Sequence, residues 1–162
     1  MITAGSYPQN RCLIMDILRK LKPKSILDMG MGTGYYGEMI RRDFPEIKLD
    51  GVEIFEDYKN ELWDFYDNIY HEDIKTMKFD YYDVYLMVDI IEHLTKEEGL
   101  ELLRSMEKDR VVLISTPWYY PQDEVEGNPY QKHLSKWLLR DFEEFEYRDF
   151  SNDLSIVILL KT

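Results

Sequence analysis

Apolar positions near the start of the chain change their spacing from one segment to the next. In residues 11–21 they stand at 13, 14, 17, 18 and 21, which places them on one face of a helix. Residues 25–29 form a short apolar run that leads directly into a cluster of glycines, as a buried strand before a tight turn does. A second helix is predicted over 36–44 and a second strand over 47–53. These segments predict a strand–helix–strand unit.

The same alternation continues through the middle of the chain. It predicts a helix over 58–65, strands over 68–70 and 82–88, a helix over 96–106 and a strand over 110–115. Thr95 and Glu98 have the spacing of a capping box at the start of the later helix. Strands that alternate with helices pair in parallel through right-handed crossovers, so we expect a doubly wound sheet with ligands at the carboxyl ends of its strands.

The C-terminal part departs from this order. After a loop over 116–129 the pattern predicts a helix over 131–142 and two strands over 145–150 and 154–160. The connection between the two strands, 151–153, is so short that they must pair antiparallel. A length of 162 residues suits one globular domain, so residues 1–162 are expected to form a single α/β domain whose mostly parallel sheet ends in an antiparallel hairpin.

Charge and cysteine content limit the partners of the chain. Lys and Arg number 20 against 32 Asp and Glu, a net charge of −12, which disfavours a polyanionic partner such as a nucleic acid. Cys12 is the only cysteine, so an intramolecular disulfide is excluded. The N-terminus lacks a signal-peptide pattern, and the longest apolar runs fall far short of the roughly 20 residues that span a bilayer. We therefore expect a cytoplasmic protein without membrane or nucleic-acid contacts.

Three glycines, Gly30, Gly32 and Gly34, lie between the first predicted strand and the following helix. Glycines at this position let the backbone approach a ligand, and the helix N-terminus offers free N–H groups. Residues 32–37 also spell GxGxxG, so a dinucleotide is one candidate ligand and a merely tight turn is another interpretation. Asp28 argues against a pyrophosphate, which its carboxylate would repel, and favours a cationic amino group.

The run from Ile26 to Gly34 resembles the DxGxGxG motif of class I S-adenosylmethionine (SAM) dependent methyltransferases. Further features follow in the order of that family: an acid 25 residues after Asp28, an acid after the third strand, and a fourth motif before a Ser-Thr-Pro segment. In this chain they are Glu53, Asp73, residues 83–94 and residues 115–117. The resemblance covers nearly the whole chain.

The resemblance implies a Rossmann-like, seven-stranded sheet of order 3-2-1-4-5-7-6 and SAM as the cofactor. It places Glu53 on the ribose hydroxyls and Asp73 near the adenine amino group. The alternative is a module that binds or senses SAM or a dinucleotide without methyl transfer. The expected cofactor-binding residues are Asp28, Gly30, Gly32, Thr33, Gly34, Glu53, Ile54, Asp73, Ile74 and Asp89.

Two histidines and one acid are candidates for the chemistry on the methyl acceptor. Glu92 and His93 follow the fourth strand, and His133 follows the long loop. An oxygen acceptor must lose its proton, and a histidine is a suitable base for that step. We therefore expect an enzyme that methylates an oxygen of a small molecule. His93 and His133 would be the base or orienting groups, and Glu92 would be their partner. The alternative is structural: His93 would cap or pack, and His133 would lie at the surface.

The spacing Asp89-x-x-Glu92-His93, with His133 later, is also similar to the ExxEH arrangement of small-RNA 3′-end 2′-O-methyltransferases, and more loosely to ubiquinone-biosynthesis O-methyltransferases. That resemblance implies that a divalent ion could bind there. Asp89 stands where the RNA enzymes have Glu and is alternatively a cofactor-facing acid. No metal ligand is therefore assigned from the sequence.

Five aromatic residues gather in or just after the long loop. They could line an acceptor pocket or lid, or simply attach the loop to the body by burying their rings. The acceptor is expected to be recognised by this loop, 116–133, and by the segment before Arg11. The five are Trp118, Tyr119, Tyr120, Tyr130 and Trp137.

Overall fold

The computed structural model describes residues 7–125 and 127–162. The strands form a seven-stranded sheet of order β3-β2-β1-β4-β5-β7-β6. This order confirms the predicted topology. The chain divides into two compact units, Met1–Leu86 and Met87–Thr162, which are described one at a time.

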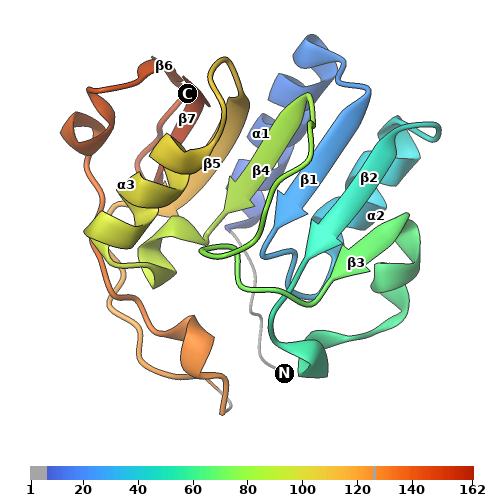
Figure 1. Cartoon of the computed structure of the whole chain (residues 1–162), viewed down its shortest axis with the longest axis horizontal. Helices are drawn as coiled ribbons and strands as arrows, with labels where there is room; N and C mark the ends of the chain where they lie inside the picture. The colour runs from blue at the N-terminus through green and yellow to red at the C-terminus, as the bar shows by residue number, and fades with distance from the viewer. Residues whose placement is uncertain (1–6, 126) are drawn as a thin grey trace. The chain divides into compact units, whose positions relative to one another are not determined.

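The first unit contains the parallel part of the sheet. Figure 1 shows β1, β2 and β3 as neighbouring strands, and β1 pairs in parallel with β2 and with β4. In register, Leu27 lies between Asp50 and Tyr85. The elements are α1 (Pro8–Leu21), β1 (Ser25–Met29), α2 (Tyr35–Asp43), β2 (Lys48–Val52), the 3-10 turns η1 (Glu56–Tyr58) and η2 (Glu61–Phe65), β3 (Asn68–Tyr70) and β4 (Val84–Val88), whose last two residues belong to the second unit.

Helix α1 shows how the periodic pattern becomes packing. Ile14, Met15, Ile17 and Leu18 are buried on one face, and Pro8 allows the helix to begin before residue 11 because the first turn needs no N–H donor there. Residues 8–10 of the segment expected to contact the acceptor thus belong to α1. Residues 1–6 of that segment lie outside the described residues.

The second unit contains the antiparallel part. β5 and β6 both pair antiparallel with β7, which confirms the hairpin expected from the short turn. Thr95 and Glu98 form the predicted capping box at the start of α3. The elements are η3 (Ile91–His93), α3 (Lys96–Ser105), β5 (Val111–Pro117), η4 (Pro129–Gln131), η5 (Leu139–Phe142), β6 (Glu146–Asp149) and β7 (Ser155–Lys161).

Two predicted helices were wrong. Residues 58–65 form parts of two short 3-10 turns, and residues 131–142 hold only the end of η4 and all of η5, with extended backbone between them. In the second case the N–H groups of His133, Leu134 and Ser135 donate to the carbonyls of Gln122 and Glu92, so they are not available for helical hydrogen bonds. Across the described residues, every helix is too short or too polar to cross a membrane.

Candidate functional site

The glycine loop after β1 adopts the conformation for which glycine is needed. Gly30, Gly32 and Gly34 have φ values of 72°, 53° and 87°, in the left-handed region that disfavours other residues. A Cβ on Gly34 would also lie 3.2 Å from the backbone oxygen of Leu62. Gly37, which completes the GxGxxG spelling, is explained by packing, because a Cβ there would lie 2.2 Å from the Tyr66 ring. A packing role is also what the last glycine of the dinucleotide pattern has, so Gly37 does not distinguish the two classes of ligand.

Glu53 follows β2, and its carboxylate reaches the glycine loop. Its Oε2 accepts the N–H of Gly32 at 2.9 Å and its Oε1 accepts the N–H of Phe55 at 2.8 Å. Burial raises the pKa of the Glu53 carboxyl above its ordinary value, and the N–H donors of Phe55, Gly32 and Ile54 and the charge of His71 oppose that rise. A carboxylate has about four acceptor positions, so this side chain can still accept a hydroxyl group of a ribose.

Asp28 ends up deeper than expected for a ligand contact. It is 2% exposed, and the hydroxyl of Tyr66 donates to its Oδ2 at 2.6 Å. Burial raises the pKa of Asp28 to about 7, against the opposing effect of the Tyr66 hydrogen bond. Its contact with a cationic amine stays a prediction. Tyr66 is a residue that sequence reasoning missed, since nothing in its local pattern pointed to Asp28.

Asp73 and its neighbours form a turn after β3. The Oδ1 of Asp73 accepts the N–H of Lys75 at 2.9 Å, and the ammonium of Lys75 lies 3.7 Å from its Oδ2. Ile54 and Ile74, the apolar residues beside the two acids, are both half-buried. The adenine contacts of Asp73 and Ile74 stay predictions.

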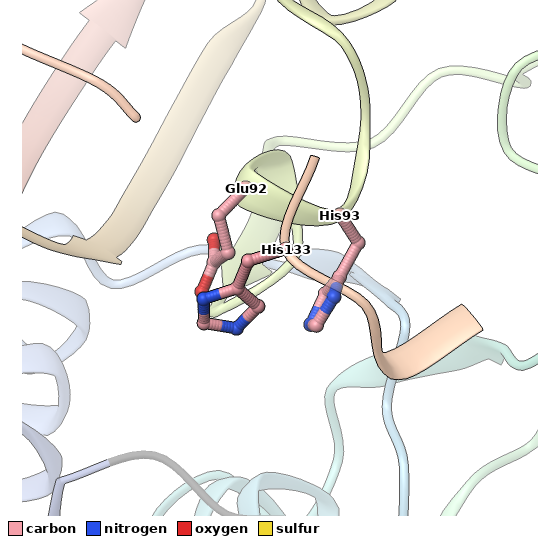
Figure 2. A group of neighbouring side chains, drawn as sticks. All are labelled: Glu92, His93 and His133. Atoms are coloured by element: carbon pink, nitrogen blue, oxygen red, sulfur yellow. The ribbon is translucent and has the colours of Figure 1, made fainter. Parts of the chain in front are cut away.

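Glu92, His93 and His133 come together in the second unit. One ligand atom from each lies within 4.8 Å of the others, although His133 is 40 residues distant from His93 along the chain. Figure 2 shows the two rings and the carboxylate extending to the same side, Glu92 and His93 from η3 and His133 from the segment after η4. The rings lie edge to face with centroids 4.8 Å apart. The structure thus brings together the three residues proposed for acceptor chemistry.

Hydrogen bonds leave the same nitrogen of each imidazole available. Nδ1 of His93 lies 3.2 Å from the carbonyl oxygen of Lys132, and Nδ1 of His133 bonds the carbonyl oxygen of Tyr120. A carbonyl only accepts, so Nδ1 carries the proton in both rings and Nε2 keeps its lone pair. Burial lowers the pKa of His93 to about 4 and lowers the pKa of His133, which favours the neutral rings. Neutral rings can act as metal ligands, and the lowered pKa makes each ring a weaker base than an ordinary imidazole.

Glu92 adds a carboxylate to the two imidazoles. It is buried, its Oε2 accepts the hydroxyl of Thr116 at 2.9 Å, and its Oε1 has no hydrogen-bond partner among the described residues. Burial raises the pKa of Glu92 well above its ordinary value, and the charge of Asp89 raises it further. An unpartnered buried carboxylate oxygen, in a group whose three ligand atoms lie within 4.8 Å of one another, fits a divalent cation, because carboxylate and neutral imidazole are ordinary ligands of such ions.

Asp89 does not join this group of three. It lies directly after β4 with φ of 53°, its N–H donates to the carbonyl of Ser115, and its buried Oδ1 has no partner in the described part of the chain. Burial raises the pKa of Asp89 to about 7. Its predicted contact with the cofactor remains a proposal.

The segment that carries His133 is attached to η3 by hydrogen bonds. The carbonyl of Glu92 accepts the N–H groups of Leu134 at 2.8 Å and Ser135 at 3.1 Å. Trp137 is fully buried, and its Nε1 donates to the carbonyl of Ile91 at 3.1 Å. These bonds fix the position of His133 relative to Glu92.

The aromatic residues of the long loop divide between the two interpretations. Trp137 and half-buried Trp118 attach the loop, the latter through a bond from its Nε1 to the carbonyl of Asn152 at 2.6 Å. Tyr119, Tyr120 and Tyr130 expose half or more of their surface, and the Tyr120 ring lies 6.0 Å from that of His133. The tyrosines are thus accessible to an acceptor, and a lid function stays a prediction.

Comparisons with known proteins find similar architectures among solved structures. No protein-family model matches the chain, and no curated protein resembles it significantly in sequence. Among solved structures, it is similar to the methyltransferase domain of bacterial CtHen1, with 18% identity, a TM-score of 0.68, and coverage of 95% of this chain and 98% of that one. The plantazolicin methyltransferase BpumL, in complex with a desmethyl plantazolicin analogue and SAH, matches with 20% identity, a TM-score of 0.67 and coverage of 96% and 86%.

A third similar structure is larger than this chain. An O-methyltransferase family protein from Burkholderia thailandensis matches with 12% identity and a TM-score of 0.63, over 93% of this chain and 56% of that one. The chain likewise spans 56% of the length of another matching structure, from Nostoc punctiforme. With the strand order 3-2-1-4-5-7-6, these likenesses show that the chain has the fold of the class I methyltransferases.

Proposed function

We propose that the protein is a SAM-dependent methyltransferase that transfers the methyl group to an oxygen of a small-molecule acceptor. The observation that carries this proposal is the glycine loop with the buried Glu53 carboxylate on its Gly32 N–H, within a class I methyltransferase fold. A similar structure that was determined with SAH, the product of SAM, supports the same cofactor. The remaining acceptor position on Glu53 suits a ribose hydroxyl. Gly32, where no atom lies within 4 Å of the position of a Cβ, suits close approach of the methionine portion.

The acceptor chemistry is proposed to belong to Glu92, His93 and His133. Methyl transfer from a sulfonium is an in-line displacement. The protein therefore mainly has to align an acceptor oxygen, remove its proton and exclude water. The Nε2 lone pairs and the Glu92 carboxylate can hold a divalent cation, which would stabilise the deprotonated oxygen. The net charge of −12 favours a small acceptor over a nucleic acid. A module that only senses a nucleotide would need no such cluster.

Calorimetry with SAM, SAH and NAD tests the cofactor. We expect binding of SAM and SAH and none of NAD, because the Glu53 carboxylate already accepts the N–H of Gly32, a donor of the glycine loop that a pyrophosphate would need. Tight binding of NAD without SAM or SAH would overturn the proposal. A screen of hydroxyl-bearing small molecules, read by SAH formation, then identifies the acceptor.

A Glu92→Gln variant tests the cation. We expect Mn²⁺ to bind the wild type and to bind the variant about 100-fold more weakly or worse. Loss of a residue that only hydrogen-bonds a metal ligand already lowers metal affinity by about 10- to 100-fold, and Glu92 is proposed as a direct ligand. Calorimetric titration with Mn²⁺ measures this. Glu97→Gln, at an exposed position on α3, is the matched control and should keep the wild-type affinity. Equal Mn²⁺ binding by wild type and Glu92→Gln would contradict the assignment.

A further inference from the structure

Three side chains from one short segment contact the glycine loop and the strand before it. Asn60 donates from Nδ2 to the carbonyl of Thr33 at 2.9 Å, and Trp63 donates from Nε1 to the carbonyl of Gly32 at 2.9 Å. Tyr66 donates from its hydroxyl to Asp28 at 2.6 Å. Three hydrogen bonds from residues 60–66 therefore end on residues 28–33.

The 3-10 geometry explains how these three side chains act together. Asn60 and Tyr66 flank η2, and Trp63 lies at its centre, so the contacting residues are three positions apart. In a 3-10 helix, side chains at this spacing lie on one line, whereas in an α-helix each step of three residues turns the direction by about 60°, so the first and third would point about 120° apart. Asn60 also fixes the start of the turn, because its Oδ1 accepts the N–H of Leu62 at 2.8 Å. The same 3-10 turn that the sequence pattern failed to predict presents one face to the loop.

The contacts hold the loop in its left-handed conformation. The carbonyls of Gly32 and Thr33 are occupied by Trp63 and Asn60, while the Gly32 N–H is held by Glu53. A loop already ordered in this way loses little conformational freedom when a ligand binds, and that raises affinity. Trp63 is the deepest anchor, since it is 3% exposed.

We propose that Asn60, Trp63 and Tyr66 form a clamp that keeps the glycine loop in the conformation that binds the cofactor, with Trp63 as a positioning residue for SAM affinity. This inference rests on the proposed function, since SAM is the ligand concerned. The clamp acts on cofactor binding and has no part in the chemistry on the acceptor.

Trp63→Phe tests the clamp because it keeps an aromatic ring and removes the N–H donor. We expect Kd for SAM and for SAH to rise about 5- to 10-fold, the value of one buried hydrogen bond. In turnover of an acceptor found by the screen, KM for SAM should rise by the same factor, and kcat at saturating SAM should stay unchanged. A role limited to folding would instead lower the active fraction, and so kcat, without changing Kd.

Trp118→Phe is the matched control. It also loses one bond from an indole N–H to a backbone carbonyl, that of Asn152, and it lies outside the clamp. We expect its Kd for SAM to equal that of the wild type. Similar weakening in both variants would show a general effect of Trp→Phe replacement and would overturn the clamp.

Asn60→Asp provides an independent test at an exposed position, where folding is not at risk. The variant keeps an oxygen for the N–H of Leu62 and loses the amide donor to the carbonyls of Thr33, at 2.9 Å, and Tyr58, at 2.8 Å. SAM carries a net positive charge, so the added carboxylate would by charge alone favour binding. Weaker binding would therefore come from the loss of the attractive contact between residue 60 and the glycine loop.

The outcomes separate the two proposals. If the wild type binds neither SAM nor SAH, the proposed function is wrong. If the wild type binds SAM and both Trp63→Phe and Asn60→Asp bind it within about two-fold of the wild type, well below the effect of one buried hydrogen bond, the function stands and the clamp is wrong.

Discussion

A His133→Ala variant is expected to bind SAM as tightly as the wild type and to lose about 100-fold or more in turnover, the usual contribution of a positioned acid–base group. The reason is that His133 lies beside Glu92 and His93 with its Nε2 lone pair available, and its described contacts are all with residues of the second unit. Calorimetry with SAM and steady-state turnover on an acceptor found by the screen measure the two effects separately.

Glu53→Ala is the control variant, in which the expected change is in SAM affinity. It removes the carboxylate that accepts the N–H groups of Gly32 and Phe55, so SAM affinity should fall. Should His133→Ala turn over acceptor at the wild-type rate, or lose SAM binding as severely as Glu53→Ala, the role assigned to His133 would be wrong.

An Asp28→Asn variant is expected to be more stable than the wild type at about pH 8, by up to about 4 kcal/mol. Burial raises the pKa of Asp28 from 3.8 to about 7 in the folded protein, and each pKa unit corresponds to about 1.4 kcal/mol. Because the folded state binds the proton more tightly than the unfolded state, the wild type loses stability as pH rises from about 4 to about 7. The amide introduced by the substitution does not ionise and still offers an oxygen to the Tyr66 hydroxyl, so the variant avoids this loss.

Urea unfolding of both proteins between about pH 4.5 and 8.5 measures the effect. The difference in free energy of unfolding should be small near pH 4.5, grow up to about pH 7 and stay constant above it. Comparing the two proteins at each pH cancels the titration of other buried acids. Asp57→Asn, at an exposed position, is the control and should follow the wild type. A stability difference that does not change with pH would contradict a raised pKa at Asp28.

Local sequence patterns predicted the elements that depend on interactions between residues close together in the sequence. The apolar face of α1, the short run of β1 before the glycines, and the capping box of α3 all depend on residues within a few positions of one another. The antiparallel β6–β7 pair followed from a turn too short for any crossover. The strand order came from the resemblance to class I methyltransferases, and the structure confirms it.

The candidate site shows the same division. Glycines with positive φ at 30, 32 and 34 could be anticipated, because their spacing after a strand is a local signal. Tyr66 beside Asp28 could not be anticipated, since the two residues are 38 positions apart and meet only when the segment around η2 packs against the glycine loop. The clamp of Asn60, Trp63 and Tyr66 likewise requires 3-10 geometry, which the apolar pattern of 58–65 does not distinguish from an α-helix.

The sequence by itself thus determined helices α1, α2 and α3, the strands, the glycine turn and the terminal hairpin. Tertiary structure alone decided that residues 131–142 are not a helix and that His133 lies beside Glu92 and His93. The physical reason is that the carbonyl of Glu92 takes the N–H groups of Leu134 and Ser135. These donors lie 42 and 43 positions farther along the chain, and hydrogen bonds over such separations leave no periodic trace in the sequence.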